Sequence, residues 1–273
     1  MTVQETIDRH VAWLGRYDID CGVLSGTNVE AGLLAQGRLA ILPYKENISA
    51  AQWTALENFV AAGGKLLVYY LLPARMEPLL GVHQTGWSQG AFATWVFADP
   101  SIPGLPARVQ QASWNITFAV PNGTLHARVS ATWEDSHGAS PGHAAWLTSD
   151  LGYFMSHVLL GDDADNKSYA LLCLVGYFLP DVWPPAAAGA IDAIGEAGPN
   201  QTYTNAVAGI HHEASFLSPT PWLSNWPAPP DASRSIPGLA LICLSPTAAW
   251  RNCNRPALLI QGASTSSNSA PTR

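Results

Sequence analysis

The apolar positions of the first 80 residues follow two patterns. Residues 3–15 place apolar side chains three or four positions apart, which predicts an amphipathic helix. Three short runs are apolar without alternation, as is typical of strands buried on both faces of a sheet; they are 21–24, 39–44 and 65–72. Short helical connections between such runs predict right-handed crossovers, so we expect the three strands to be parallel neighbours in one sheet.

Capping signals mark the two helices between these strands. Ser49 and Gln52 have the spacing of a capping box, and Gly63 follows the last apolar residue as a C-cap. Asn28 is a candidate N-cap for the earlier helix, which we expect to end at Gly37. The alternation of strands and helices predicts an α/β fold with a flavodoxin-like open parallel sheet and flanking helices.

The second half of the chain changes character. Asn122-Gly123 separates two strand-like runs, 113–120 and 124–133, which predicts a β-hairpin. A second strand pair is expected from 144–149 and 152–160, followed by a helix over 166–183 that Asn166 caps. These β-hairpin additions extend the parallel sheet.

The pattern fails after about residue 217. Prolines interrupt the following 20 residues, and the end of the chain is rich in Ser, Thr and Ala. Apart from PGLALICL, this part lacks a long periodic apolar stretch. We therefore divide the chain into an α/β domain, 1–217, and a Pro/Ser-rich tail, 218–273, that we expect to be loosely packed or disordered.

Composition excludes several classes of protein. The formal net charge is −7, which argues against nucleic-acid binding. We found no apolar run of the roughly 18 residues that a membrane span requires and no signal peptide, so we expect a cytoplasmic protein that avoids membranes. Cys21 and Cys173 lie in apolar runs and are interpreted as reduced core thiols, whereas Cys243 and Cys253 could form a disulfide. We expect no cofactor.

Several runs resemble a known family. The segments 23–34, 39–72 and 76–82 are VLSGTNVEAGLL, LAILPYKENISAAQWTALENFVAAGGKLLVYYLL and MEPLLGV. They resemble the glutamine-amidotransferase-like domains attached to glycoside hydrolases, including the middle domain of family 42 β-galactosidases. Later runs, QASWNI, TWEDSHG, TSDLGYFMSHVLLGDDADNKSYALL and IDAIGEAGP, resemble the amino-terminal region of family 10-like glycosyl hydrolases.

Two departures from that family limit what the resemblance implies. Amidotransferases place a Cys nucleophile at the turn after the strand that matches LLVYYLL, whereas this chain continues with Pro73, Ala74 and Arg75. The amidotransferase activity therefore does not carry over. The related hydrolases continue into a catalytic (β/α)8 barrel, and the sequence after residue 217 lacks that pattern, which favours a fragment or a diverged reading frame.

One motif suggests an enzyme. Residues 86–90 spell G-W-S-Q-G, the G-x-S-x-G spacing that exposes a nucleophilic serine in hydrolases. In that interpretation Ser88 is the nucleophile and His157 its base, with Asp150 or Asp135 orienting the base. The flanks are wrong for a strand-to-helix turn, so an ordinary loop serine is the competing interpretation.

Acidic and aromatic residues give further candidates. Glu134 and Asp135 form an acid pair beside Trp133, suited either to glycoside chemistry or to a solvated hairpin end. Five tryptophans could stack on sugar rings or fill the core; they are Trp87, Trp95, Trp114, Trp133 and Trp146.

Two clusters are candidates for metal binding. Asp162, Asp163 and Asp165 could form a weak calcium or magnesium site, or solvate a loop and cap the next helix. The run His211-His212-Glu213 could also bind a metal, although neighbouring histidines on a helix point apart.

Together these patterns favour a non-catalytic, amidotransferase-like accessory domain of a carbohydrate-active protein, acting in assembly or substrate presentation. Its expected partner is a catalytic (β/α)8 barrel or another copy of itself. A serine ester hydrolase that uses Ser88 and a sugar-binding module are the alternatives.

Overall fold

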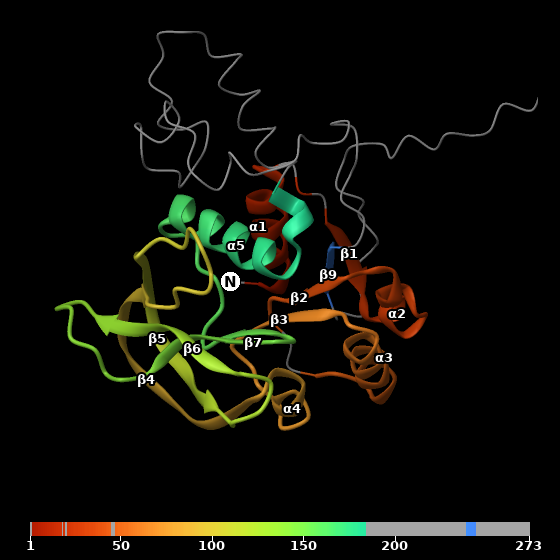
Figure 1. Ribbon diagram of the computed structural model, residues 1–273, viewed down its shortest axis with the longest axis horizontal. Helices are drawn as coiled ribbons and strands as arrows, with labels where there is room; N and C mark the ends of the chain where they lie inside the picture. The colour runs from red at the N-terminus through yellow and green to blue at the C-terminus, as the bar shows by residue number, and fades with distance from the viewer. Residues whose placement is uncertain (1, 18, 20, 45–46, 184–238, 244–273) are drawn as a thin grey trace, which may run out of the picture.

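The computed structural model describes residues 2–17, 19, 21–44, 47–183 and 239–243 (Figure 1). This part of the chain forms an α/β fold around a nine-stranded mixed sheet, in the order β1-β9-β2-β3-β8-β7-β6-β4-β5. The parallel strands are β1 (Gly22–Ser25), β9 (Leu239–Cys243), β2 (Leu39–Leu42), β3 (Lys65–Tyr69) and β8 (Gly152–Met155). The antiparallel strands are β7 (Ala144–Ser149), β6 (Arg128–Asp135), β4 (Val82–Phe97) and β5 (Arg108–Pro121).

The three apolar runs near the start of the chain are parallel strands, as their lack of alternation predicts. β2 and β3 are neighbours. β1 and β2 are not, because β9 lies between them and pairs with both, so the expectation of three adjacent strands is wrong at this point. Five residues of the predicted tail segment, 218–273, thus belong to the sheet.

Helices cover both faces of the sheet. α1 (Val3–Gly15) and α5 (Ala164–Phe178) pack together on one face, and α2 (Gly26–Glu30) and α3 (Ala50–Ala61) lie on the other (Figure 1). The short helix α4 (Glu77–Leu80) and the 3₁₀ turns η1 (Leu33–Gln36) and η2 (Pro180–Val182) complete the described helical segments. Each face has its own core of buried apolar side chains. No described helix is long and apolar enough to cross a membrane.

The capping signals are only partly as predicted. Ser49 and Gln52 form the expected capping box of α3. Ser25, and not Asn28, is the N-cap of α2, and the Asn28 side-chain oxygen accepts a hydrogen bond from the Ser25 backbone N–H (3.0 Å). The helix stops early because Gly32 adopts a positive φ of 84° before η1. Likewise α5 begins after Asp163, not Asn166.

The antiparallel half differs from the predicted pattern at one point. β4 pairs with β5 on one side and with β6 on the other, so the expected hairpin of 113–120 with 124–133 is wrong. The predicted pairing of 144–149 with the following strand is confirmed as β7 with β8. The backbone N–H of Thr117 donates to the carbonyl of Ser156 (2.9 Å), which brings β5 back to the end of β8.

Three tryptophans fill the core of this half. Trp95, Trp133 and Trp146 are at most 1% exposed and meet edge to face. Cys21 and Cys173 are both buried, as predicted. Cys253, the side chain of Cys243, and His211-His212-Glu213 lie outside what the structure describes.

Candidate functional site

An aromatic side chain follows each of three parallel strands at one edge of the sheet. Tyr44 comes two residues after β2, Tyr70 directly after β3, and His157 two residues after β8. The Tyr44 and Tyr70 rings stack with centroids 6.0 Å apart, and the Tyr70 and His157 rings meet edge to face at 5.4 Å. The carboxyl edge of parallel strands is where α/β sheets commonly bind ligands.

Two tryptophans of the antiparallel half join this group. The indole N–H of Trp87 in β4 donates to the Tyr70 hydroxyl (3.0 Å). The ring of Trp114 in β5 lies 5.5 Å from that of His157, edge to face. Trp87 is 48% exposed and Trp114 is 59% exposed, whereas the three tryptophans of the core are almost wholly buried. We call Tyr44, Tyr70, Trp87, Trp114 and His157 the aromatic cluster.

The backbone at Tyr70 is strained. Its φ of 63° lies in the left-handed region, which a bulky residue rarely adopts and which costs roughly 1–3 kcal/mol. The Tyr70 N–H donates to the carbonyl of Met155 at the end of β8 (2.8 Å), and this bond helps to hold the conformation. Strain of this kind gathers at ligand sites, where it orients a side chain.

His157 forms the buried wall of the cluster. It is 3% exposed, and its Nδ1 lies 3.0 Å from the carbonyl oxygen of Val158 and 3.4 Å from the amide nitrogen of Gln111. Burial lowers the pKa of His157, so the neutral imidazole is favoured at pH 7. The ring is therefore a buried, mainly uncharged support against which Tyr70 and Trp114 pack.

The predicted Ser88, His157 and Asp150 are not brought together. Ser88 lies inside β4 and its hydroxyl donates to the backbone carbonyl of Gln89 (2.9 Å). Asp150 lies in the turn before β8, where its carboxylate is 2.7 Å from Nδ1 of His126. His157 follows the opposite end of β8, and the strand-to-helix turn that a nucleophilic serine requires is not present at Ser88.

The acid pair at the end of β6 has structural partners. Both terminal nitrogens of Arg108 donate to the Glu134 carboxylate. Asp135 accepts from the backbone N–H groups of His137 (2.8 Å) and Ala139 (2.9 Å), and these bonds lower its pKa. The neighbouring Trp133 is buried and donates from its indole nitrogen to the Ser156 hydroxyl (2.8 Å).

The three candidate metal ligands at the start of α5 also have structural partners. The carboxylate of Asp162 accepts from the buried Lys167 ammonium (2.6 Å) and from the Ala112 N–H (3.0 Å). The Asp163 carboxylate accepts from the Gln110 N–H (2.8 Å), and that of Asp165 accepts from Arg16 (3.0 Å). Within the described residues, no group of three or more His, Cys, Asp and Glu side chains could hold a metal ion.

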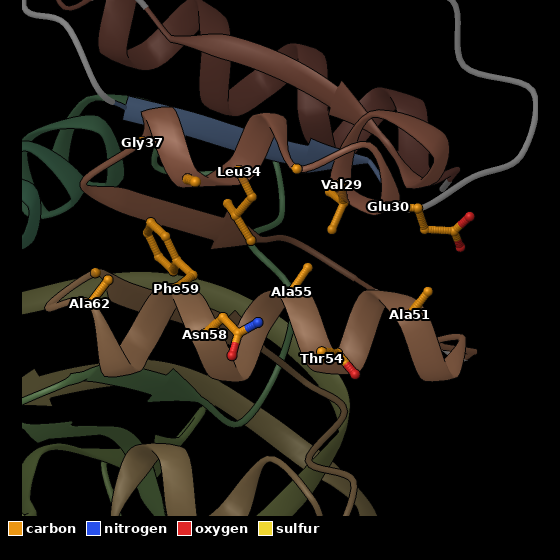
Figure 2. Close-up of a pocket in the computed structure, with 13 residues that line it drawn as sticks. Val29, Glu30, Leu34, Gly37, Ala51, Thr54, Ala55, Asn58, Phe59 and Ala62 are labelled. Atoms are coloured by element: carbon orange, nitrogen blue, oxygen red, sulfur yellow. The ribbon is translucent and has the colours of Figure 1, made fainter.

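A groove of about 530 Å³ lies on the opposite face from α1 and α5, between η1 and α3 (Figure 2). Its lining includes small residues such as Gly32, Ala51 and Ala55. At one end the Glu30 carboxylate accepts from the Ser49 hydroxyl (2.7 Å) and from the Gln52 amide (2.9 Å). These polar groups are thus engaged in hydrogen bonds at the start of α3, so they are not free to act on a ligand in the groove.

Sequence reasoning named Trp87 and Trp114 but missed the tyrosines. Tyr44 and Tyr70 belong to no motif and stand in apolar runs that predict strands. The available signal was their position, since each lies near the carboxyl end of a predicted parallel strand, where side chains of neighbouring strands converge.

Comparison with known proteins gives structural likenesses only. No family model matches the chain, and no curated protein matches its sequence. The structure resembles alpha-L-fucosidase isoenzyme 2 from Paenibacillus thiaminolyticus, at 18% identity and a TM-score of 0.42 over 52% of this chain. It also resembles a putative ThuA-like protein from Bacteroides uniformis ATCC 8492, at 10% identity and a TM-score of 0.43 over 56% of this chain. A third likeness is to Agd3, a carbohydrate deacetylase, at 12% identity and a TM-score of 0.38 over 57% of this chain.

These matches are partial on both sides. The chain spans 25% of the fucosidase, 74% of the ThuA-like protein and 32% of the deacetylase. The neighbours are carbohydrate-active enzymes and a ThuA-like protein, and the likeness assigns neither an activity nor a substrate to this chain.

Proposed function

We propose that this chain is a non-catalytic accessory domain of a carbohydrate-active protein. Its role would be assembly or substrate presentation, beside a catalytic (β/α)8 barrel or a second copy of itself. The observation that carries the proposal is that the acidic and the aromatic candidate residues have different environments. The candidate acids Asp162 and Glu134 are engaged in hydrogen bonds within the fold, whereas Trp87 and Trp114, which contact the side chains that follow the parallel strands, are about half exposed.

Glycoside hydrolysis needs chemistry that the acid pair does not favour. One carboxyl group must act as a general acid, which requires a raised pKa, and another must face it across the scissile bond. The pKa of Asp135 is shifted the other way by its backbone hydrogen bonds. Glu134 is held by the forked side chain of Arg108.

The ester hydrolase alternative lacks a comparable observation in its favour. Serine becomes nucleophilic when a base accepts its proton. The Ser88 hydroxyl instead donates to a backbone carbonyl, and the described hydrogen bonds of His157 lead to Gln111 and Val158.

The test is an activity screen of the purified full chain. Substrates are glutamine, nitrophenyl glycosides and short nitrophenyl esters, with Glu134→Gln, Asp135→Asn and Ser88→Ala as matched variants. We expect no glutaminase or glycosidase turnover above that of a heat-denatured sample. Glycoside turnover that survives repurification and disappears in Glu134→Gln or Asp135→Asn would overturn the accessory role. Ester turnover abolished in Ser88→Ala would instead support the hydrolase.

A further inference from the structure

We propose that the aromatic cluster is a carbohydrate-binding surface on which Trp87 and Trp114 stack against the rings of an uncharged oligosaccharide. The inference builds on the proposed accessory function, because it names the ligand that such a domain would hold. It rests on the exposure, the fixed geometry and the location of these rings.

Exposure separates the two tryptophans from the rest of the antiparallel sheet. Trp95, Trp133 and Trp146 point into the core, so the fold buries indoles readily when they serve packing. Trp87 and Trp114 remain about half exposed in neighbouring strands of the same sheet. Large aromatic groups left in water beside a ligand-binding edge mark a surface that a partner covers.

The rings are held in place before any ligand arrives. Trp87 is fixed through its indole N–H by the Tyr70 hydroxyl, and Trp114 packs edgewise on the buried His157. The strained backbone of Tyr70 fixes the orientation of its ring, which contacts both Trp87 and His157. A preformed surface loses less side-chain entropy on binding, and this favours affinity.

The chemistry of the surface matches a sugar face. A pyranose presents C–H groups above and below its ring, which lie well on the electron-rich face of an indole, and hydroxyl groups around its rim. Trp87 contacts Tyr70, whose ring lies 5.4 Å from His157, and Trp114 lies 5.5 Å beyond. The two indoles thus contact different members of the Tyr70–His157 pair, and we propose that each stacks on its own sugar ring.

Charge and one polar atom refine the ligand class. The formal net charge of −7 opposes an acidic polysaccharide, whereas an uncharged one is indifferent to it. Asn115 follows Trp114 and lies opposite Gln89 in the β4–β5 ladder. Its side-chain oxygen is buried and has no hydrogen-bond partner among the described residues, so a sugar hydroxyl would satisfy it once the half-buried side chain turns outward.

The experiment measures binding by the full chain to soluble polysaccharides in affinity gels. The uncharged probes are β-glucan, xylan, galactan and mannan, and polygalacturonate is the acidic probe. Kd values then come from tryptophan fluorescence titrations with oligosaccharides of the retained polymer. The variants are Trp87→Ala, Trp114→Ala and Trp114→Phe, with Val129→Ala as the control because Val129 is exposed (41%) outside the cluster. Circular dichroism and thermal unfolding verify that each variant folds.

We expect at least one uncharged polymer to be retained, with affinity about tenfold lower in each tryptophan-to-alanine variant. Trp114→Phe keeps a ring and should bind within a few-fold of wild type, and Val129→Ala should be unchanged. Retention of polygalacturonate alone, retention of no polymer, or equal affinity in folded alanine variants would overturn the proposal. Sugar binding together with catalytic turnover would sink the accessory function but leave this surface standing, so the two failures are distinguishable.

Discussion

The junction between the two halves of the sheet depends on one glycine. In the described sheet, the ladder between β3 and β8 connects the four strands β1, β9, β2 and β3 to β8 and, through it, to the antiparallel strands, and Gly152 opens β8 opposite Leu66. A Cβ at Gly152 would lie 1.8 Å from the Leu66 carbonyl oxygen and 2.9 Å from the Leu66 nitrogen. These are backbone atoms of a central strand, so neither can move aside without breaking the ladder.

The change Gly152→Ala should therefore be strongly destabilising. Overpacking of a core typically costs about 1–3 kcal/mol, and a side chain at the observed φ of 153° adds roughly 1–3 kcal/mol of strain. We expect a loss of about 3 kcal/mol or more from a domain whose total stability is of the order of 5–15 kcal/mol. At this size that corresponds to a Tm lower by about 6–12 °C.

Gly22→Ala is the matched control. Gly22 also opens a parallel strand of the same sheet, but its Cβ would meet nothing within 4 Å. This variant should be as stable as wild type or up to about 1 kcal/mol more stable, since alanine restricts the unfolded chain. Urea unfolding followed by tryptophan fluorescence gives both values. Equal midpoints for Gly152→Ala and wild type, or equal losses in the two variants, would refute the argument.

The remaining predictions concern burial and the far strand. Burial lowers the pKa of His10 to about 4, so its contribution to stability is complete above pH 6.5 and is lost as the pH falls toward 4. In urea unfolding at pH values from 6.5 to 4, the free energy of unfolding of His10→Phe should fall by about 3 kcal/mol less than that of wild type. An equal dependence of the two free energies on pH would contradict this prediction. Leu241→Pro should break the pairing of β9 with β1 and β2, which amide exchange would report as lost protection at 22–25 with protection retained at 144–149. Asp162→Asn should cost about 3 kcal/mol by leaving the buried Lys167 ammonium uncompensated, and the double variant with Lys167→Met should recover most of it; no recovery would argue against the ion pair.

Local signals predicted the parts of the fold that local physics determines. Uninterrupted apolar runs gave β2 and β3, and the Ser49 capping box gave the start of α3. The alternation of 91–97 predicted a strand, but the first half of β4 was missed because it is short of apolar residues and rich in polar ones, so its pairing depends on β5 and not on its own propensity. β9 was missed because its five residues stand among prolines, and only the gap between β1 and β2 makes them a strand.

The candidate site was predictable to a smaller degree. Trp87 and Trp114 were considered among five tryptophans, but the sequence does not distinguish exposed indoles from core ones. Exposure is decided by which strands lie next to each other, and that depends on the misread position of β4. Tyr70 reaches the site because of its left-handed backbone conformation, which no pattern of residues in the sequence predicts.

The position of β9 also has a consequence for biosynthesis. Ser25 pairs with Cys243, so β1 reaches its sheet partner β9 only after about 220 further residues have been added by the ribosome. At the usual 5–20 residues per second, this wait lasts roughly 10–45 s. Throughout it, β2 presents an open edge and β1 has no partner in the sheet. A nascent chain with an unpaired parallel edge invites pairing with strands of other chains, so we expect its yield on overexpression to depend on temperature and on chaperones that shield such edges.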